Sequence, residues 1–202
     1  MAKDNKEFRI EVPGGENVVV LHTCCAPCSS AIIECMMNSG ITPVIYYCNP
    51  NIYPREEYEI RKNECTRYAQ ALGLEIVDAD YDHENWLREV AGMENEPERG
   101  GRCLKCFKLR LLRTAQFAVQ RGIKVITTTL ASSRWKSLDQ INEAGRWACE
   151  ETETPVIWWD QNWRKGGLQE RRLQIIKEYD FYNQLYCGCE FSIRKDDQNK
   201  GE

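Results

Sequence analysis

Apolar runs and amphipathic stretches alternate along almost the whole chain. Short runs of apolar and β-branched residues, bounded by turn-forming residues, predict five buried strands. These runs span residues 16–23, 42–49, 75–81, 123–130 and 154–160. Between and after them, apolar residues recur at helical spacing, and several of these stretches open at Pro or end at Gly. The predicted helices span residues 27–40, 54–74, 83–93, 103–122, 137–151 and 166–180.

This alternation predicts an α/β fold, a three-layer sandwich in which helices cover both faces of a mostly parallel five-stranded sheet. The chain contains no internal repeat or low-complexity linker, so we expect residues 1–202 to form one domain with a disordered tail at 194–202. Ligands of such sheets bind beyond the carboxyl ends of the strands. The segments "CCAPC", "TTTLASS" and "WWDQNWRKGG" follow the first, fourth and fifth strands, and we expect them to face one crevice.

Charge and hydropathy exclude two classes of protein. The net charge of −4 argues against a protein that covers nucleic acid by bulk electrostatics, although it permits a local basic patch. No run approaches the roughly 20 apolar residues that span a membrane. The first residues, "MAKDNKEFRIEVPGGE", do not resemble a signal peptide, so we expect a cytoplasmic protein.

Eleven cysteines are unusual for a protein of a reducing compartment, where such a number favours metal binding or redox chemistry over structural disulfides. Four of them stand alone on predicted helices or strands and are interpreted as small buried hydrophobes: Cys35, Cys48, Cys65 and Cys149. The other seven fall into three close groups: Cys24, Cys25 and Cys28; Cys103 and Cys106; Cys187 and Cys189.

The first group lies at a predicted helix N-terminus, where free backbone N–H groups and the helix dipole favour a thiolate over a thiol. A thiolate is both a metal ligand and a nucleophile. His22 directly precedes this group and is interpreted as a core histidine with satisfied hydrogen bonds. The chain has neither a G-x-x-x-x-G-K-[ST] motif nor a G-x-G-x-x-G motif after the first strand, so ATP and NAD sites are not supported.

The second group shares one face of the helix 103–122, because Cys103 and Cys106 are three residues apart. Arg110 and Arg113 continue that face, which suits a metal beside an anionic substrate; the alternative is a solvated cationic face with two incidental cysteines. The core-facing stripe of the same helix is predicted to comprise Leu104, Phe107, Leu111, Ala115 and Ala118. The third group, Cys187-Gly-Cys189, can form a strained disulfide or supply two ligands.

The donor set favours iron over zinc. Structural zinc takes four ligands, and seven grouped cysteines exceed one such site. The only two histidines, His22 and His83, do not offer a catalytic zinc site. Ligation by sulfur alone favours an iron–sulfur cluster. A [4Fe–4S] cluster uses at most four thiolates, which leaves thiols for a second metal or a redox pair.

Five segments together resemble the cobalamin-independent epoxyqueuosine reductases: "LHTCCAPCS", "YYCNPNIYPREEYEIR", "RCLKCFKLRL", "TTTLASSRWKS" and "LYCGCEFS". The resemblance runs from about residue 18 to 192. It implies a fold like that of the adenine nucleotide α-hydrolases, with the nucleotide loop replaced by cysteines. It also implies removal of the epoxide oxygen from epoxyqueuosine at the wobble position of tRNA, with an iron–sulfur cluster and additional iron. The chain departs from the family at Ser133-Arg134-Trp135 and at Trp163.

On this resemblance, all seven grouped cysteines become candidate ligands of a [4Fe–4S] cluster and a mononuclear iron. Cys24, Cys25, Cys103 and Cys106 are the first candidates, with Cys28 as a remaining ligand. Cys187 and Cys189 either complete the shell of the second iron or act as an internal dithiol. The catalytic candidates are Cys24, Cys25, Cys187 and Cys189. An aspartate could replace one thiolate, and Asp80 and Asp160 lie at predicted strand ends.

The implied substrate is an anticodon loop, which proteins recognise mainly through splayed bases. Candidates for phosphate contacts are Arg110, Arg113, Arg134, Lys136, Arg164 and Lys165. Candidates for base stacking are Tyr53, Trp135, Trp158, Trp159 and Trp163, of which Trp158 and Trp159 are also candidate core residues. A basic rim on an acidic protein predicts modest, salt-sensitive affinity. The electron donor is unidentified; a ferredoxin or a flavodoxin would serve.

Two other functions fit part of the pattern. A thiol–disulfide oxidoreductase would use Cys187 and Cys189 as its active pair and would need no metal. A zinc-stabilised RNA-binding module would contain zinc but no iron and would turn over no substrate. The metal content of the anaerobically purified protein separates the three hypotheses.

Overall fold

The five predicted strands form one parallel sheet in the order β3-β2-β1-β4-β5. The computed structural model describes residues 8, 10–184 and 186–193, so the predicted tail at 194–202 lies outside the described residues. The strands are β1 (Val18–Thr23), β2 (Thr42–Tyr47), β3 (Ile76–Asp78), β4 (Val125–Thr128) and β5 (Ile157–Trp158). The sequence-based prediction of a mostly parallel five-stranded sheet is thus confirmed.

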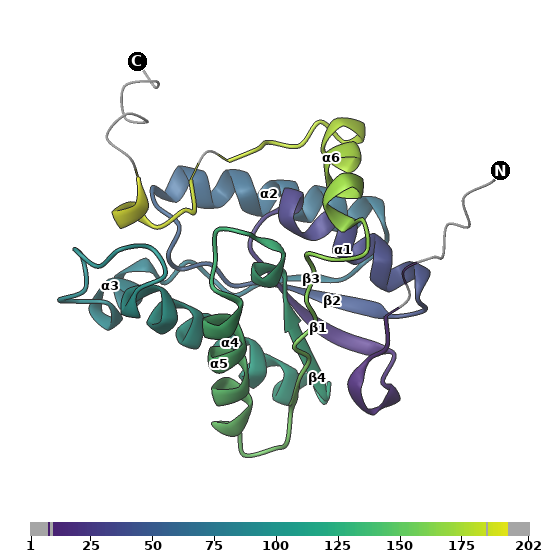
Figure 1. Cartoon of the computed structure of the whole chain (residues 1–202), viewed down its shortest axis with the longest axis horizontal. Coiled ribbons are helices and arrows are strands. Elements are labelled where there is room, and N and C mark those ends of the chain that lie inside the picture. Colours follow the sequence, from purple (N-terminus) through teal and green to yellow (C-terminus); the bar gives the residue numbers. More distant parts are fainter. Residues whose placement is uncertain (1–7, 9, 185, 194–202) are drawn as a thin grey trace.

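The six predicted helices are all present and cover the two faces of the sheet (Figure 1). They are α1 (Ala26–Asn38), α2 (Arg55–Ala71), α3 (His83–Glu89), α4 (Gly101–Arg121), α5 (Leu138–Glu150) and α6 (Leu168–Glu178). Short 3₁₀ helices are η1 (Pro13–Gly15), η2 (Thr129–Ser132) and η3 (Glu190–Ser192). Helix α1 packs against α2 and α6 on one face, whereas α4 packs against α5 and α3 on the other. In the described part of the chain, no helix is both long and apolar enough to cross a membrane.

Burial explains why these segments form these elements. Strand β1 is buried from its second residue onward, and β4 is buried throughout, as expected for central strands covered on both sides. On α4, the predicted core-facing residues Phe107, Leu111, Ala115 and Ala118 are all buried. Leu104 is partly buried and packs against the same core.

The strand order switches direction between β1 and β4. From β1 the chain moves to β2 on one side of the sheet, and it returns later to place β4 on the other side. His22 of β1 pairs with both Tyr46 of β2 and Thr128 of β4, so the segments that follow these strands leave the sheet side by side. A crevice at such a switch point is where open α/β sheets bind ligands.

Candidate metal centre

Cys24, Cys25 and Cys28 form a compact group of thiols directly after β1. The three Sγ atoms all lie within 4.8 Å of one another, a spacing at which they could hold a metal ion. Cys25 occupies the N-cap position of α1 with an extended backbone, and Cys28 lies in the first turn. Within the described residues, no other set of three or more His, Cys, Asp or Glu side chains is gathered so closely.

Cys24 is the most acidic of the three thiols. Hydrogen bonds from the Cys25 and Cys28 thiols hold the pKa of Cys24 well below its ordinary value. Burial raises the pKa of Cys25, and the hydrogen bond between Cys28 and Cys24 raises the pKa of Cys28 to about 12. In the metal-free protein, Cys24 is therefore the thiol of this group that loses its proton first. A metal ion would displace the remaining protons.

The other four grouped cysteines meet at a second, smaller cavity of about 50 Å³. Cys103 and Cys106, from the first two turns of α4, line it together with Cys187 and Cys189 from the C-terminal segment. Cys187 also lines the larger cavity of about 500 Å³, which Cys24 and Cys28 line from the other side. Six of the seven grouped cysteines thus line two adjoining cavities that share Cys187, and Cys25 lies beside Cys24 and Cys28.

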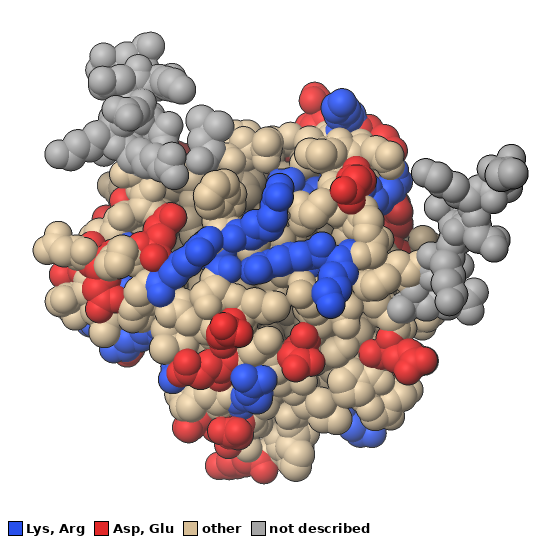
Figure 2. Space-filling model, viewed as in Figure 1, with Lys and Arg blue, Asp and Glu red and all other residues tan. Residues whose placement is uncertain are grey.

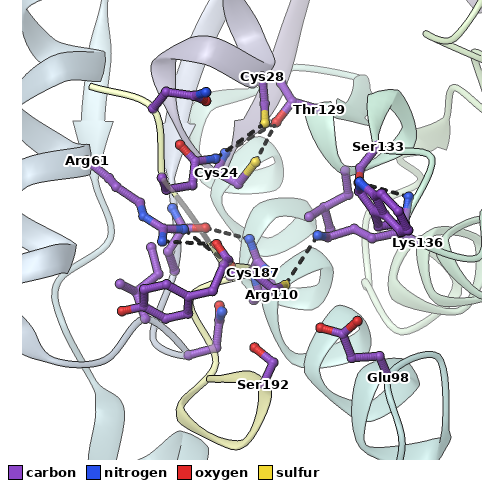
Figure 3. A pocket seen from close by; sticks show the side chains of 18 of the residues that line it. Cys24, Cys28, Arg61, Glu98, Arg110, Thr129, Ser133, Lys136, Cys187 and Ser192 are labelled. Atoms are coloured by element: carbon purple, nitrogen blue, oxygen red, sulfur yellow. Dashed lines mark hydrogen bonds between the residues drawn. The ribbon is translucent and has the colours of Figure 1, made fainter. Parts of the chain in front are cut away.

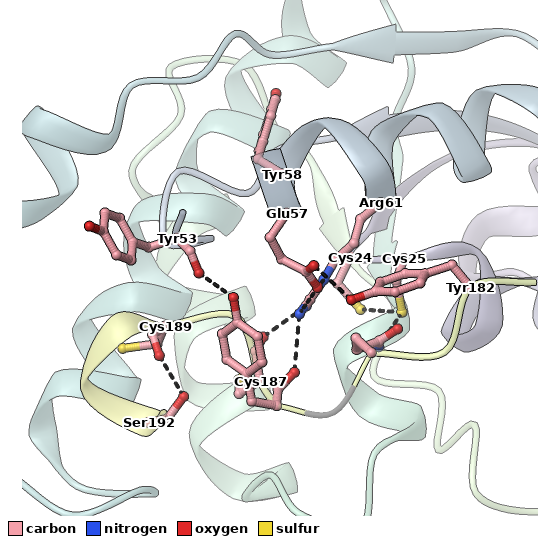
Figure 4. A network of polar contacts seen from close by, with 12 residues as sticks. Cys24, Cys25, Tyr53, Glu57, Tyr58, Arg61, Tyr182, Cys187, Cys189 and Ser192 are labelled. Carbon is pink, nitrogen blue, oxygen red and sulfur yellow. Dashed lines mark hydrogen bonds and ion pairs between the residues drawn. The ribbon is translucent and has the colours of Figure 1, made fainter. Parts of the chain in front are cut away.

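A buried ion pair on α2 holds the C-terminal segment in place (Figure 4). The Arg61 guanidinium lies 2.6 Å from the Glu57 carboxylate, and both side chains are almost completely buried. Arg61 also donates to the backbone oxygens of Tyr186 at 3.2 Å and Cys187 at 3.3 Å. Glu57 accepts a hydrogen bond from the Tyr182 hydroxyl at 2.8 Å. The pair therefore binds the C-terminal segment at Tyr182 and again at Tyr186 and Cys187.

Gly188 allows the chain to place a thiol on each side of it. Its φ of 106° lies in a region that L side chains rarely adopt, and its carbonyl accepts from the Tyr53 N–H at 2.9 Å. A Cβ at this position would lie 2.9 Å from Ile52 Cγ1 and 3.0 Å from Arg61 Nη1. Cys189 then pairs with Ile52 in an isolated antiparallel bridge. Glycine is therefore required between the two cysteines by both conformation and space.

Six of the seven sulfurs face a hydrogen-bond donor, which is what a thiolate or a metal-bound sulfur needs. The donors, with their distances to Sγ, are Thr129 Oγ1 for Cys24 (3.4 Å), Gln184 Nε2 for Cys25 (2.9 Å) and Cys28 (3.8 Å), Arg99 N for Cys103 (3.3 Å), Arg110 Nη1 for Cys106 (4.0 Å) and Lys136 Nζ for Cys187 (3.3 Å). These donors come from five different parts of the chain, so the arrangement fits a bound metal group.

The isolated cysteines lie in different surroundings. Cys35, Cys48 and Cys65 are buried, and Cys149 is partly buried. Among the described residues, nothing donates to the sulfurs of Cys48, Cys65 or Cys149, and the Cys35 thiol itself donates to the Phe8 carbonyl. Their interpretation as small hydrophobes is confirmed by this burial.

His22 is also the core residue that the sequence suggested. Its ring nitrogens bond to Thr128 Oγ1 at 2.7 Å and to the Cys48 carbonyl at 3.0 Å. Burial, assisted by the charge of Arg110, lowers the pKa of His22 to about 3. The imidazole is therefore neutral at physiological pH and is already occupied at both nitrogens.

The larger cavity is lined by cations as well as thiols (Figure 3). Arg61, Arg110, Lys136 and Arg172 all contribute to its wall. Although burial opposes its charge, Lys136 has its pKa raised above the ordinary value by the nearby Cys187 and Cys24 thiols. Positive charge around several thiols stabilises them as thiolates and favours an anionic ligand.

The structure brings only some of the predicted substrate residues to the cavities. Arg110 lines both cavities but is buried, and it donates to Asn49 and to the Cys48 carbonyl. Lys136 and Trp135 line both cavities, and the Trp135 side chain is 77% exposed. Four predicted cations are absent from both linings: Arg113, Arg134, Arg164 and Lys165. Arg113 instead donates to the Ala79 carbonyl, and Arg164 donates to the carbonyls of Ser133 and Lys136.

Two predicted stacking residues are core residues instead. Trp159 and Trp163 are 4% and 0% exposed and pack edge to face with ring centroids 5.3 Å apart. The core interpretation offered for Trp159 is therefore the correct one, and the prediction that Trp163 stacks on a substrate base is wrong, because neither ring is accessible. Trp158 is partly buried and its Nε1 bonds to Asn142 Oδ1, whereas Tyr53 remains 43% exposed.

The crevice has different walls from those predicted. The segments after β1 and β4 line it, as expected, but no residue of "WWDQNWRKGG" does so within the described chain. The loop after β2 takes that place with Asn49 and Asn51. Asp80 and Asp160, the suggested aspartate ligands, line neither cavity. Arg61, Glu98, Arg172 and Gln184 line the larger cavity and were not among the predicted site residues.

Positive charge is not confined to the cavity walls. Figure 2 shows Lys and Arg side chains gathered in a band across the middle of one face, with most of the acidic side chains around it. A protein of net charge −4 thus carries the local basic patch that its composition permitted.

Comparison with known proteins assigns the chain to a family. A family model described as "Epoxyqueuosine reductase QueH" matches residues 19–195. A relative from Histophilus somni, named epoxyqueuosine reductase QueH, is 48% identical over 192 residues, covering 95% of this chain and 78% of the relative. A relative of the same name from Haemophilus influenzae is 48% identical over 95% of this chain and 77% of its own length. A relative of the same name from Thermotoga maritima is 33% identical over 87% of this chain and 90% of its own length.

Replacing Gly188 with Ala is expected to disturb the metal centre more than the fold. The new Cβ would meet Ile52 and Arg61 and would move both flanking cysteines. We expect metal bound per chain, measured by elemental analysis after anaerobic purification, to fall by more than about half. Gly92→Ala is the matched control, because Gly92 has a φ of 82° but open space around it. Equal metal content in the two variants would contradict this role of Gly188.

Cys24 is expected to react as a thiolate in the metal-free protein. An ordinary thiol gains about tenfold in alkylation rate per pH unit below its pKa. Because the pKa of Cys24 is lowered, its rate should change little between about pH 7 and pH 8, while Cys28 in the same cavity should remain unmodified. Peptide mass spectrometry after iodoacetamide treatment measures both rates. A tenfold rise at Cys24 over that interval would be inconsistent with the hydrogen-bonded arrangement.

Proposed function

The chain belongs to the epoxyqueuosine reductase QueH family, and from this premise we propose that it removes the epoxide oxygen of epoxyqueuosine at the wobble position of tRNA, giving queuosine. It is an oxidoreductase, and the proposal adds its cofactors: a [4Fe–4S] cluster and a second, mononuclear iron. The observation that carries the proposal is the gathering of the seven thiols. Six of them line two adjoining cavities, Cys25 lies beside Cys24 and Cys28, and all except Cys189 have a hydrogen-bond donor.

The reaction converts an epoxide to an alkene and water, and it consumes two electrons and two protons. The C–O bonds break, the oxygen leaves as water, and the two carbons form the double bond. When bound, the iron centres would supply the electrons and a Lewis acid for the leaving oxygen. The proposed ligands are Cys24, Cys25, Cys28, Cys103, Cys106, Cys187 and Cys189. The electrons come from an external donor, for which a ferredoxin or a flavodoxin is suitable.

The chain's own residues prepare this chemistry in two ways. Thr129, Gln184 and the other donors hold the sulfurs in fixed positions and stabilise their negative charge. Lys136 and Arg110 line both cavities, so their positive charge would stabilise negative charge that develops on an oxygen leaving from either cavity. These donors and cations are already in place in the protein without substrate, so their side chains need little reorganisation during the reaction.

The tRNA would bind across the mouth of the larger cavity. The exposed Trp135 ring is a suitable platform for a base of the anticodon loop. Arg134 and Lys165 are exposed and free to contact phosphates, and a few such contacts produce a modest, salt-sensitive affinity. Arg113 and Arg164 are engaged by backbone carbonyls, so they would position loops around the substrate more than bind its phosphates. A tRNA substrate also implies a cytoplasmic location.

Substitution of single cysteines tests the proposal. Cys24→Ser and Cys106→Ser are expected to lower turnover of epoxyqueuosine-containing tRNA by at least about a thousandfold, since each removes a metal ligand. The matched controls Cys35→Ala and Cys149→Ser should stay within about twofold of the original chain, because their sulfurs lie in the core or at its edge. Nucleoside mass spectrometry measures the loss of epoxyqueuosine and the gain of queuosine.

The two alternative functions give different outcomes in the same assay. A thiol–disulfide oxidoreductase would lose activity on disulfides when Cys187 or Cys189 is replaced and would not need iron. A zinc-stabilised RNA-binding module would bind tRNA without converting it. Absence of queuosine with iron-loaded, reduced protein and intact substrate would contradict the proposed reaction.

A further inference from the structure

Glu98 is the one carboxylate among the described residues that line the two cavities, and it lines both of them. Apart from its thiols, the remaining charged groups of the larger cavity are the cations Arg61, Arg110, Lys136 and Arg172. Figure 3 shows the Glu98 side chain extending from below toward the space beside Cys187. A single carboxylate therefore faces a site that is otherwise lined by thiols and cations.

The cations of the cavity already have protein partners. Arg61 pairs with Glu57, and Arg110 bonds to Asn49. Lys136 donates to Cys187, and Arg172 donates to the Pro27 carbonyl at 2.8 Å. Glu98, by contrast, has no ion pair or side-chain hydrogen bond with any residue that the structure describes. Its carboxylate is available for a ligand.

The loop that carries Glu98 is held firmly at the next residue. Arg99 adopts a positive φ of 67°, and its N–H donates to Cys103 Sγ at 3.3 Å. The Arg99 guanidinium donates to the carbonyls of Arg134 and Trp135, both at 2.9 Å. Gln140 in turn donates to the Arg99 carbonyl at 2.8 Å. Glu98 is thus fixed between the metal-binding end of α4 and the loop that presents Trp135.

We propose that the Glu98 carboxylate binds a protonated amine on the substrate base. This inference rests on the proposed function and adds how that site recognises its substrate. Epoxyqueuosine joins its epoxide-bearing five-membered ring to the base through a secondary amine, which is cationic at neutral pH. The four cations of the cavity would repel such a group, and Glu98 offsets that repulsion at one defined position.

Glu98 therefore selects the modified base over an unmodified one. A tRNA with guanosine at the wobble position has no amine to pair with Glu98 and would meet only the contacts to phosphates and bases. The carboxylate also orients the ring, because the amine is attached beside the epoxide. A charge-assisted contact at a partly solvated site corresponds to about a fivefold to tenfold preference.

The test compares the binding of two tRNAs to the anaerobically purified holoenzyme. One tRNA carries epoxyqueuosine at the wobble position, and the other is identical but carries guanosine. Glu98→Gln removes the charge and keeps the size of the side chain. Glu94→Gln is the matched control, because Glu94 lies in the same loop but lines neither cavity. Equilibrium dissociation constants are measured for all three proteins, with metal content and melting temperature as checks on folding.

The original chain and Glu94→Gln are expected to bind epoxyqueuosine tRNA about fivefold to tenfold more tightly than guanosine tRNA. Glu98→Gln should lose most of this preference while its affinity for guanosine tRNA stays unchanged. An unchanged preference in Glu98→Gln would overturn the inference, and so would an equal loss of affinity for both tRNAs. Turnover by the original chain reports on the proposed function separately: a chain that reduces epoxyqueuosine but keeps its preference without Glu98 refutes only the amine contact.

Discussion

The buried pair of Glu57 and Arg61 is the interaction on which the site depends. It ties the segment that carries Cys187 and Cys189 to α2, more than 120 residues earlier in the chain. Without that attachment, the thiols after β1 and those of α4 would face an open crevice. Breaking a buried pair by removing one partner typically costs about 3–5 kcal/mol, because the remaining charge stays buried. The pair thus positions two of the proposed metal ligands, and moving them away would cost the free energy of breaking the pair.

The surroundings of the sulfurs determine which charge state each of them favours. Burial raises the pKa of the Cys25, Cys103 and Cys189 thiols, in the case of Cys189 to about 12. The surrounding N–H and O–H donors favour the opposite state, in which the sulfur is negative and metal-bound. The protein therefore builds positions for thiolates that only a metal group can fully occupy. The same loop architecture that binds phosphate in nucleotide-binding α/β proteins, a strand end followed by a helix N-terminus, here presents Cys24, Cys25 and Cys28.

Much of this could be predicted from sequence, since hydrophobic periodicity reports directly on which residues are buried. All eleven main elements, the parallel sheet and the meeting of the segments after β1 and β4 follow from it. The tryptophans after β5 could not be assigned correctly, because aromatic side chains serve equally as core residues and as stacking surfaces. Trp163 is buried through its contact with Trp159, which depends on how the loop folds back. Arg61 was detectable in principle, because it falls on the same α2 stripe as the buried Tyr58, Cys65 and Tyr68. The position of Glu98 depends on long-range bonds from Arg99, which no local pattern encodes.

The central claim is that the seven grouped cysteines hold two iron centres of different kinds. Mössbauer spectroscopy of the ⁵⁷Fe-labelled, anaerobically purified chain, with chemical counts of iron and sulfide, measures this directly. We expect about five irons and about four sulfides per chain, with a [4Fe–4S] spectrum and a separate signal from one further iron. A zinc-containing protein, or one that stays free of iron after anaerobic reconstitution with iron and sulfide, would contradict it.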